Sequence, residues 1–202
     1  VSARKRDERL LDVPVAITAI GGAELARTGA TDLSKIGQML PQVRFEKVGG
    51  GGSGATFAIR GIGSASGDKG LEQTVAVNID GVQSSRGELS VLSMFDVQQI
   101  EVLKGPQGTL YGRNASGGAI NLISKRPGQD TTLEASLDVG NYGFVRATGI
   151  TGGGLTDTLA VRAAVQHAER DGYLTDGYND QDTLAARLTA LWQPTAALDL
   201  LF

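Results

Sequence analysis

The sequence predicts an α+β domain followed by antiparallel strands of a truncated transmembrane β-barrel. Glycine accounts for 29 of the 202 residues, a high share that is typical of many short strands joined by turns. The first part also contains a capped segment with helical spacing. From Thr131 onward, apolar and polar residues alternate strictly in segments of about ten residues, the length of a membrane-spanning strand. We expect the domain to occupy residues 1–128 and the strands to occupy residues 129–202.

Composition excludes several classes of protein. A hydrophobic share of 41% argues against disorder, and a net charge of −3 argues against a nucleic-acid surface. The absence of cysteine excludes disulfides, thiolate metal sites and cysteine nucleophiles. The chain starts at a valine and stops inside a strand-like run, so we expect both ends to be cut and any targeting segment to have been removed or to lie outside this sequence.

The first part reads as short strands around one helix. A strand is expected in PVAITAIGG, which begins at Pro14. Thr31 or Asp32 can cap a helix that ends before Pro41, and its apolar positions are Leu33, Ile36, Met39 and Leu40.

Further strands are expected on both sides of a glycine loop at residues 49–54, in VRFEKV and TFAIRGI. TVAVNIDGV is a strand that ends in the turn signal Asp80–Gly81. A short helix is expected around Leu89 to Met94.

The second part alternates in TLEASLDVG, FVRATGIT, TLAVRAAVQH and TLAARLTALW. Its apolar face is either the core of a soluble sandwich or the lipid-facing surface of an outer-membrane barrel. The scarcity of aromatic residues favours the barrel. Three short connections (GNYG, GGGLTD and QPTAA) and one long one at residues 168–182 also favour it, because such barrels have tight turns on one side and long loops on the other. Trp192, beside a short turn, fits either a membrane interface or a soluble core.

A glycine-rich run gives the most specific signal. Residues 100–127 read IEVLKGPQGTLYGRNASGGAINLISKRP, with structural glycines at Gly105, Gly108, Gly112, Gly117 and Gly118. This run, together with DVPVAITAI, LPQV, FAIRGIGS and VAVNIDGV, resembles the plug domain of TonB-dependent outer-membrane receptors, of the iron–siderophore type. The resemblance continues into their first barrel strands and covers essentially the whole chain.

The resemblance implies a plug lodged inside a barrel of about 22 strands, of which about five are present here. It implies that the glycines make sharp turns against the barrel wall and that Gly117–Gly118 allows close backbone approach. The TonB box near the N-terminus of such receptors is largely missing from this sequence. We expect the chain alone not to be a competent transporter.

The implied function is TonB-dependent import of a scarce, bulky solute, most simply a ferric siderophore, across the outer membrane of a Gram-negative bacterium. Cobalamin, oligosaccharides or other organic nutrients are alternatives within the family. A non-transporting soluble β-rich binding or adhesive protein is the alternative of another class. The implied partners are TonB, outer-membrane lipid and the small-molecule ligand, with no cofactor and no nucleic acid. No enzyme is expected, since the sequence lacks GxGxxG, GxSxG and a phosphate-loop Gly-Lys-Ser/Thr.

Two sets of site residues follow from the resemblance. Arg60, Glu101 and Lys104 are expected at the contact between plug and barrel. The two basic residues would pair with glutamates of the inner barrel wall, or else within the plug with Glu101 as a neighbour. Ligand contacts are expected from two loops, which otherwise are simply solvated; the candidates are Ser64, Ser66, Asp68, Lys69, Glu72, Gln73, Ser84, Ser85 and Arg86. His167 is the single histidine, and no metal site is expected around it.

Overall fold

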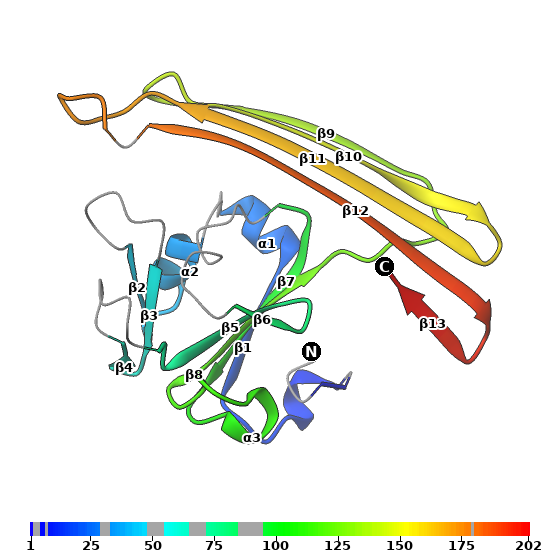
Figure 1. The fold of residues 1–202 in the computed structure, drawn as a ribbon, viewed down its shortest axis with the longest axis horizontal. Coiled ribbons are helices and arrows are strands. Elements are labelled where there is room, and N and C mark those ends of the chain that lie inside the picture. Colours follow the sequence, from blue (N-terminus) through cyan, green and yellow to red (C-terminus); the bar gives the residue numbers. More distant parts are fainter. Residues whose placement is uncertain are drawn as a thin grey trace. The chain divides into compact units, whose positions relative to one another are not determined.

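The chain folds into two units, Val1–Ser124 and Lys125–Phe202 (Figure 1). The computed structural model describes residues 1, 5–6, 8–28, 33–47, 55–64, 72–84, 95–178 and 180–202. The change of unit falls between Ser124 and Lys125, whereas the sequence analysis places it after residue 128. No helix in the described ranges combines the length and the apolar character that membrane crossing requires.

The first unit mixes short helices with two sheets. Its helical elements are η1 (Leu10–Asp12), α1 (Gly22–Arg27), α2 (Leu33–Met39) and α3 (Gly108–Tyr111). Its strands are β1 (Ile17–Gly21), β2 (Val43–Lys47), β3 (Ala55–Ile59), β4 (Ile62–Gly63), β5 (Val75–Ile79), β6 (Val82–Ser84), β7 (Val97–Lys104) and β8 (Gly118–Ser124).

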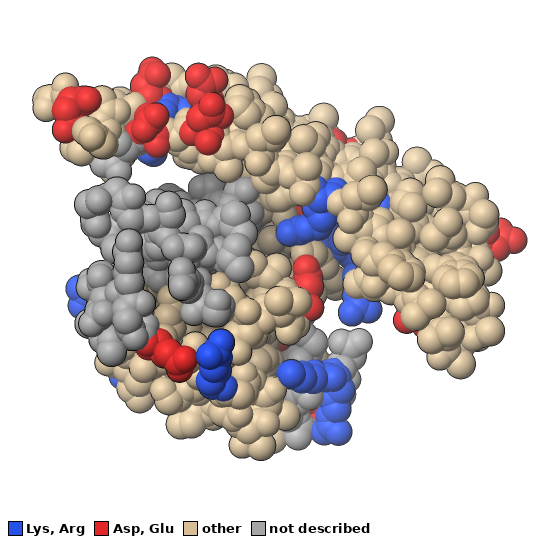
Figure 2. Space-filling model, in the orientation of Figure 1, with Lys and Arg blue, Asp and Glu red and all other residues tan. Residues whose placement is uncertain are grey.

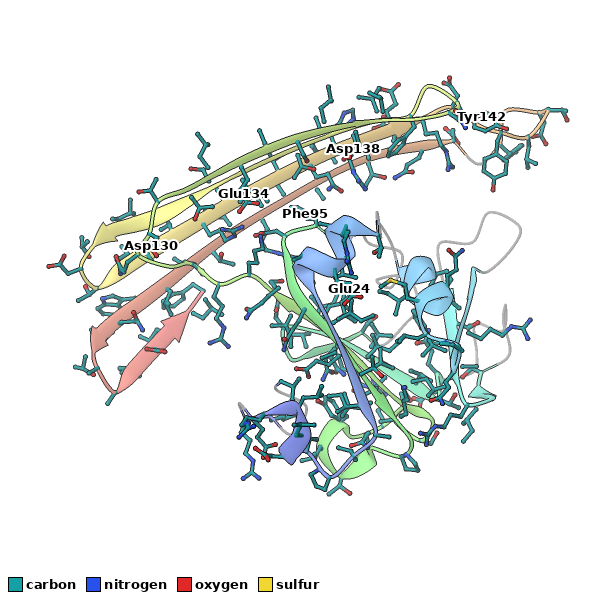
Figure 3. All side chains as sticks on the ribbon, turned by 180° about the vertical axis from the view of Figure 1, so that it is seen from behind. Glu24, Phe95, Asp130, Glu134, Asp138 and Tyr142 are labelled. Carbon is teal, nitrogen blue, oxygen red and sulfur yellow. The ribbon has the colours of Figure 1, made fainter. Side chains whose placement is uncertain are left out.

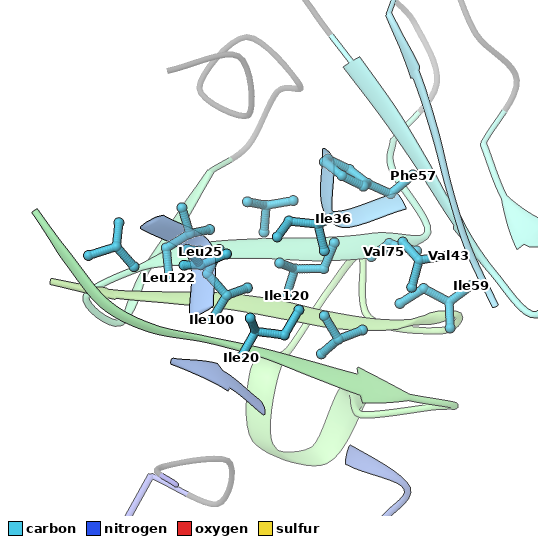
Figure 4. Packing of buried hydrophobic residues seen from close by; sticks show 13 residues of the cluster. Ile20, Leu25, Ile36, Val43, Phe57, Ile59, Val75, Ile100, Ile120 and Leu122 are labelled. Atoms are coloured by element: carbon cyan, nitrogen blue, oxygen red, sulfur yellow. The ribbon is translucent and has the colours of Figure 1, made fainter. Parts of the chain in front are cut away.

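The main sheet has the strand order β1-β7-β8-β5-β6, and a smaller sheet has the order β2-β3-β4. β5 and β8 run parallel, while the other neighbours in the main sheet are antiparallel. One face of the main sheet carries Ile20, Ile100 and Ile120, which pack with residues of α1, α2 and the small sheet in the principal core (Figure 4). Burying these branched side chains provides the main stabilisation of the unit.

The local predictions for this unit are partly confirmed. The helix α2 ends before Pro41 as expected, and Asp80–Gly81 forms the predicted hairpin turn, with φ of +49° and +85°. TFAIRGI was expected to be one strand, and that prediction is wrong. Arg60 and Gly61 adopt φ of +53° and +81° and turn the chain between β3 and β4. The proposed caps Thr31 and Asp32, the loop at 49–54 and the helix at 89–94 lie outside the described residues.

The second unit is one antiparallel sheet with the order β13-β12-β11-β10-β9. Its strands are β9 (Thr132–Val139), β10 (Val145–Thr156), β11 (Leu159–Arg170), β12 (Gln181–Thr195) and β13 (Leu198–Leu201). The segments GGGLTD and QPTAA were expected to be turns, but Gly152–Thr156 and Gln193–Thr195 continue strands. The turns are instead at residues 157–158 and 196–197, so β10, β11 and β12 reach 12, 12 and 15 residues.

The two faces of this sheet differ in chemistry, as the alternation predicts. Its apolar face carries large side chains that remain exposed, including Leu133 at 84%, Leu137 at 68% and Leu188 at 76%. Such a continuous apolar surface is rare on a soluble monomer. In Figure 2, acidic side chains gather at the end of the sheet that carries the connection between β11 and β12, and most of the remaining visible surface of the sheet is uncharged.

The opposite face of the sheet is polar, and ion pairs join side chains of different strands on it. Arg146 on β10 donates to Asp138 on β9 at 3.0 Å, and Arg162 on β11 lies 3.9 Å from Glu134. Both acidic residues stand on β9, where Figure 3 labels them. One apolar and one ion-paired face is the arrangement of a sheet that separates lipid from a polar interior.

Candidate functional site

Four of the predicted ligand-binding residues lie at one end of the main sheet. β5 and β8 both start at this end, where Val75 is paired with Gly118, and β6 runs back toward it and finishes at Ser84. Ser64, Glu72 and Gln73 precede β5, and the glycine-rich turn precedes β8. The other predicted residues of this set lie outside the described residues; they are Ser66, Asp68, Lys69, Ser85 and Arg86.

Ser64 has a structural contact at this end. Its hydroxyl donates to the carbonyl of Glu72 at 2.9 Å and accepts from the backbone N–H of Thr74 at 2.9 Å. The side chain therefore joins Ser64 to the residues just before β5. Both of these hydrogen bonds are made with the backbone, so the contact is a structural one.

Glu72 joins the first loop to the glycine-rich turn. Its Oε1 lies 3.3 Å from Arg113 Nη1. In the amide orientation that satisfies its surroundings, Asn114 donates to Glu72 Oε2 at 2.9 Å. Gln83 Nε2 also donates to the Arg113 carbonyl at 2.8 Å. Three separate segments thus meet in one polar cluster.

The cluster lies on the surface of the first unit, because the side chains of Glu72 and Arg113 are each 65% exposed. An ion pair at such exposure contributes little to stability, about 0–1 kcal/mol. It does present both charge signs and an amide on one surface, which suits a polar or charged solute. Sequence reasoning missed Arg113 and Asn114, because it read LYGRNAS only as a turn.

A second polar group is buried inside the sheet. Glu101, Asn121 and Asn78 stand in one row across β7, β8 and β5. The fully buried Glu101 accepts from Gln99 Nε2 at 2.7 Å and from Asn121 Nδ2 at 3.5 Å. Asn78 Nδ2 donates to Asn121 Oδ1 at 3.1 Å. These bonds offset the cost of burying a carboxylate and place Glu101 in the first unit's own interior.

Tyr111 of α3 is hydrogen-bonded to the middle residue of this row, Asn121. Asn121 Nδ2 donates to its hydroxyl oxygen at 2.6 Å. Burial raises the pKa of Tyr111 above its ordinary value, the hydrogen bond from Asn121 lowers it, and the charge of Glu101 raises it further. Two asparagines at matching places in central apolar strands, VAVNI and AINLI, were the available sequence signal for this row.

Arg60 and Lys104 occupy different settings. Arg60 is exposed in the β3–β4 turn, and its backbone N–H donates to the carbonyl of Gln42 at 2.9 Å. Lys104 ends β7 and is half-buried. Their pairing with a barrel wall stays a prediction.

Two of the five predicted structural glycines, Gly117 and Gly118, are crowded by other residues of the first unit, and the expected contact of the glycines with a barrel wall stays a prediction. A Cβ on Gly118, at φ +148°, would collide with the carbonyl of Leu103, and one on Gly117 would lie 3.1 Å from Ile62. Gly105 and Gly112 have φ of +108° and +72°. Gly108 shows neither a positive φ nor a neighbour within 4 Å.

No group of three or more histidine, aspartate or glutamate side chains within the described ranges is placed to hold a metal ion. His167 Nε2 lies 3.1 Å from Asp182 Oδ1 in an exposed pair.

The first unit, with its main sheet and its glycine-rich turn, matches a known family. The family model for the TonB-dependent receptor plug domain matches residues 9–119, more than half of the chain. The chain belongs to the TonB-dependent receptor family. The first unit is therefore its plug domain, and the family is one of receptors in the outer membrane of Gram-negative bacteria.

Three relatives illustrate the family. The catecholate siderophore receptor Fiu of Escherichia coli K12 is 35% identical over 158 residues, covering 76% of this chain and 19% of that protein. The pesticin receptor of Yersinia pestis is 34% identical over 142 residues, covering 69% of this chain and 20% of that protein. The crystal structure of the ferric yersiniabactin uptake receptor FyuA from Yersinia pestis matches with a TM-score of 0.76 and 27% identity, covering 88% of this chain and 28% of that one.

These comparisons confirm the predicted fold class, a plug followed by antiparallel strands of a receptor barrel. The chain spans about a fifth of the length of the curated relatives that it matches. We call the five-stranded sheet of the second unit, β9 to β13, the wall sheet from here on, because its strands match those of receptor barrels.

Proposed function

We propose that the receptor containing this chain actively imports a ferric siderophore across the outer membrane, driven by TonB. The observation that carries the proposal is the pairing, in one chain, of a plug domain with a wall sheet whose apolar face is exposed and whose other face is ion-paired. The apolar face contacts outer-membrane lipid and the ion-paired face lines the interior. A catecholate siderophore receptor and a ferric yersiniabactin receptor among the relatives support this class of solute.

In this proposal, the solute first meets the polar cluster of Glu72, Arg113 and Asn114. Many ferric siderophore complexes are anionic or rich in oxygen atoms, so an exposed guanidinium and an amide suit them. TonB then pulls on the segment before the plug, and the plug rearranges to open a path. No bond of the solute is made or broken, so selectivity comes from differences in binding.

Other solutes are compatible with the same fold. Cobalamin and oligosaccharides also offer hydrogen-bonding surfaces to such a cluster. The alternative of a soluble adhesive protein fits less well, because Leu133, Leu137 and Leu188 would then remain exposed to water at a high cost. Pairing of Arg60 and Lys104 with the interior of the barrel stays part of the proposal.

Calorimetric binding to a purified full-length receptor that carries residues 1–202 tests the choice of solute. The ligands are a ferric catecholate complex, cobalamin and an oligosaccharide. The proposal predicts tight binding of the ferric complex alone. Binding of only cobalamin or the oligosaccharide would contradict the solute class, and binding of none would contradict import of these nutrients.

A matched pair of variants tests the cluster. Arg113→Gln removes the exposed cation beside Glu72 and is expected to weaken ferric-complex binding about tenfold, the worth of one charge-assisted hydrogen bond. Arg126→Gln removes a second exposed arginine outside the cluster and is expected to leave binding unchanged. If both variants bind the ferric complex with equal affinity, the cluster is not part of the binding site.

A further inference from the structure

The connection between plug and wall sheet, residues 125–131, is fastened to the wall sheet at its first residue. We call this segment the linker. Lys125 Nζ lies 3.7 Å from Glu134 Oε1 on β9, and the same carboxylate oxygen lies 3.9 Å from Arg162 Nη2 on β11. The Arg162 side chain is only 7% exposed, so Glu134 is held from the sheet side and from the linker side at once.

Gln129 fastens the linker a second time, on β10 and on the turn that follows it. Its carbonyl accepts from the N–H of Gly154 at 3.1 Å, and its Nε2 donates to the carbonyl of Asp157 at 3.4 Å. The Gln129 side chain occupies the place where a Cβ on residue 154 would stand, because such a Cβ would collide with Gln129 Oε1. A Cβ on Gly153 would lie 3.3 Å from Thr131 Cα.

The glycines at 152–154 therefore have a structural role that the sequence pattern does not indicate. They continue strand β10, and two of them leave room for the linker to lie against it. Gln129 of the linker lies against Gly154, and Thr131 lies against Gly153. If the glycines were needed for the turn between β10 and β11, they would stand at residues 157–158, where that turn lies.

The residue just before the linker is fastened to the plug. Ser124 donates its backbone N–H to Asp80 Oδ1 at 2.8 Å and its hydroxyl to Asp80 Oδ2 at 2.7 Å. Ser124 and Lys125 are neighbours in the chain, yet each is held by a different unit. The structural boundary between the units falls at the same bond.

We propose that the linker is a fixed part of the wall and that the plug moves about a hinge at Ser124–Lys125. The backbone offers only two soft torsions per residue, so a hinge this short guides the plug along a narrow set of motions. The alternative is a loose tether that leaves the wall together with the plug. The inference deepens the proposed function, because it states which residues stay in place while the path opens.

A reversible lock distinguishes the two cases. The sequence contains no cysteine, so Gln129→Cys with Gly154→Cys adds one defined pair to a full-length receptor that carries residues 1–202. With the disulfide formed, TonB-dependent uptake of iron from a ferric catecholate complex is expected to equal that of the reduced receptor. Uptake that is lost on oxidation and restored by a reductant would overturn the proposal. Failure of the pair to oxidise would contradict the close approach of Gln129 to Gly154.

A second lock tests the plug side of the hinge. Asp80→Cys with Ser124→Cys joins two residues of the plug, and uptake is expected to survive this disulfide as well. Both locks together are expected to leave uptake unchanged, because the hinge lies between them. Loss of uptake only in the doubly locked receptor would show that one of the two fastenings must open.

Hydrogen exchange separates this inference from the proposed function. A receptor that takes up no iron even when reduced would contradict import, but it would still report on the linker. The Gly154 amide, which donates to Gln129, is expected to exchange as slowly as amides inside β11. Rapid exchange of Gly154 in the intact receptor would overturn the fixed linker whatever the solute.

Discussion

Ser124 donates both its backbone N–H and its hydroxyl to the carboxylate of Asp80, at 2.8 and 2.7 Å. Asp80 lies 44 residues earlier, in the left-handed turn that joins β5 to β6. Its own N–H donates to the carbonyl of Leu122 at 3.0 Å. The turn thus holds the last strand of the plug at the point where the chain leaves it.

Removing this carboxylate is expected to loosen the end of β8. Asp80→Ala leaves the Ser124 N–H and hydroxyl without their acceptor and disfavours the left-handed φ, so we expect a loss of about 1–3 kcal/mol in local stability. Asp80→Asn keeps one acceptor and tolerates that φ, so its loss should be smaller. Exchange of the Ser124 amide measures both. If the Ser124 amide exchanges at the same rate in wild type and in Asp80→Ala, the contact does not stabilise the end of β8.

Gly118 is expected to tolerate no side chain. Gly118→Ala forces a Cβ toward the Leu103 carbonyl at φ +148°, and strain with overpacking should cost about 2–4 kcal/mol. Gly108→Ala is the matched control, because its Cβ would meet nothing within 4 Å. Urea unfolding of the plug within the intact receptor compares them. Similar midpoints for the two variants would refute the crowding at Gly118.

Tyr111 should make plug stability depend on alkaline pH. Its pKa is raised in the folded state, so above pH 10 the unfolded chain gives up the proton while the folded chain keeps it. The stability from this group is therefore complete below pH 10 and is lost as the pH rises through the folded pKa. Tyr111→Phe should show a smaller fall in unfolding free energy between pH 9 and pH 11. A fall identical to wild type would exclude this tyrosine as the cause.

The two faces of the wall sheet should respond oppositely to charge. Leu137→Arg places a cation on the apolar face and should cost about 2–4 kcal/mol and reduce assembly into the outer membrane. Ser136→Arg is adjacent but faces the other side, near Glu134 and Asp138, and should assemble normally (Figure 3). The amount of heat-resistant folded receptor in outer-membrane fractions measures both. Normal assembly of the Leu137 variant would contradict contact with lipid.

The sequence predicted those elements that local rules control. The helix α2 follows from helical spacing before Pro41, and the Asp80–Gly81 turn follows from its dipeptide. The Arg60–Gly61 turn was missed because its flanking residues look like one continuous strand. The glycines at 152–154 were misread as a turn because the linker residues that lie against two of them, Gln129 and Thr131, are some 20–25 residues away in the chain.

The candidate site was predictable only as a region. Ser64, Glu72 and Ser84 do lie at one end of the sheet, but the contacts of Glu72 with Arg113 and Asn114 depend on the register of β5 with β8. Parallel pairing of strands some 40 residues apart leaves no local pattern. Glu101 was singled out for its charge, and its burial beside Asn121 depends on the same register.

Uptake of radioactive iron from a ferric catecholate complex tests the central claim most directly. The assay uses cells whose own siderophore receptors are deleted and which produce a full-length receptor carrying residues 1–202, with and without TonB. The account predicts uptake that requires both the receptor and TonB. Uptake at the same rate without TonB, or none despite assembled receptor, would contradict it.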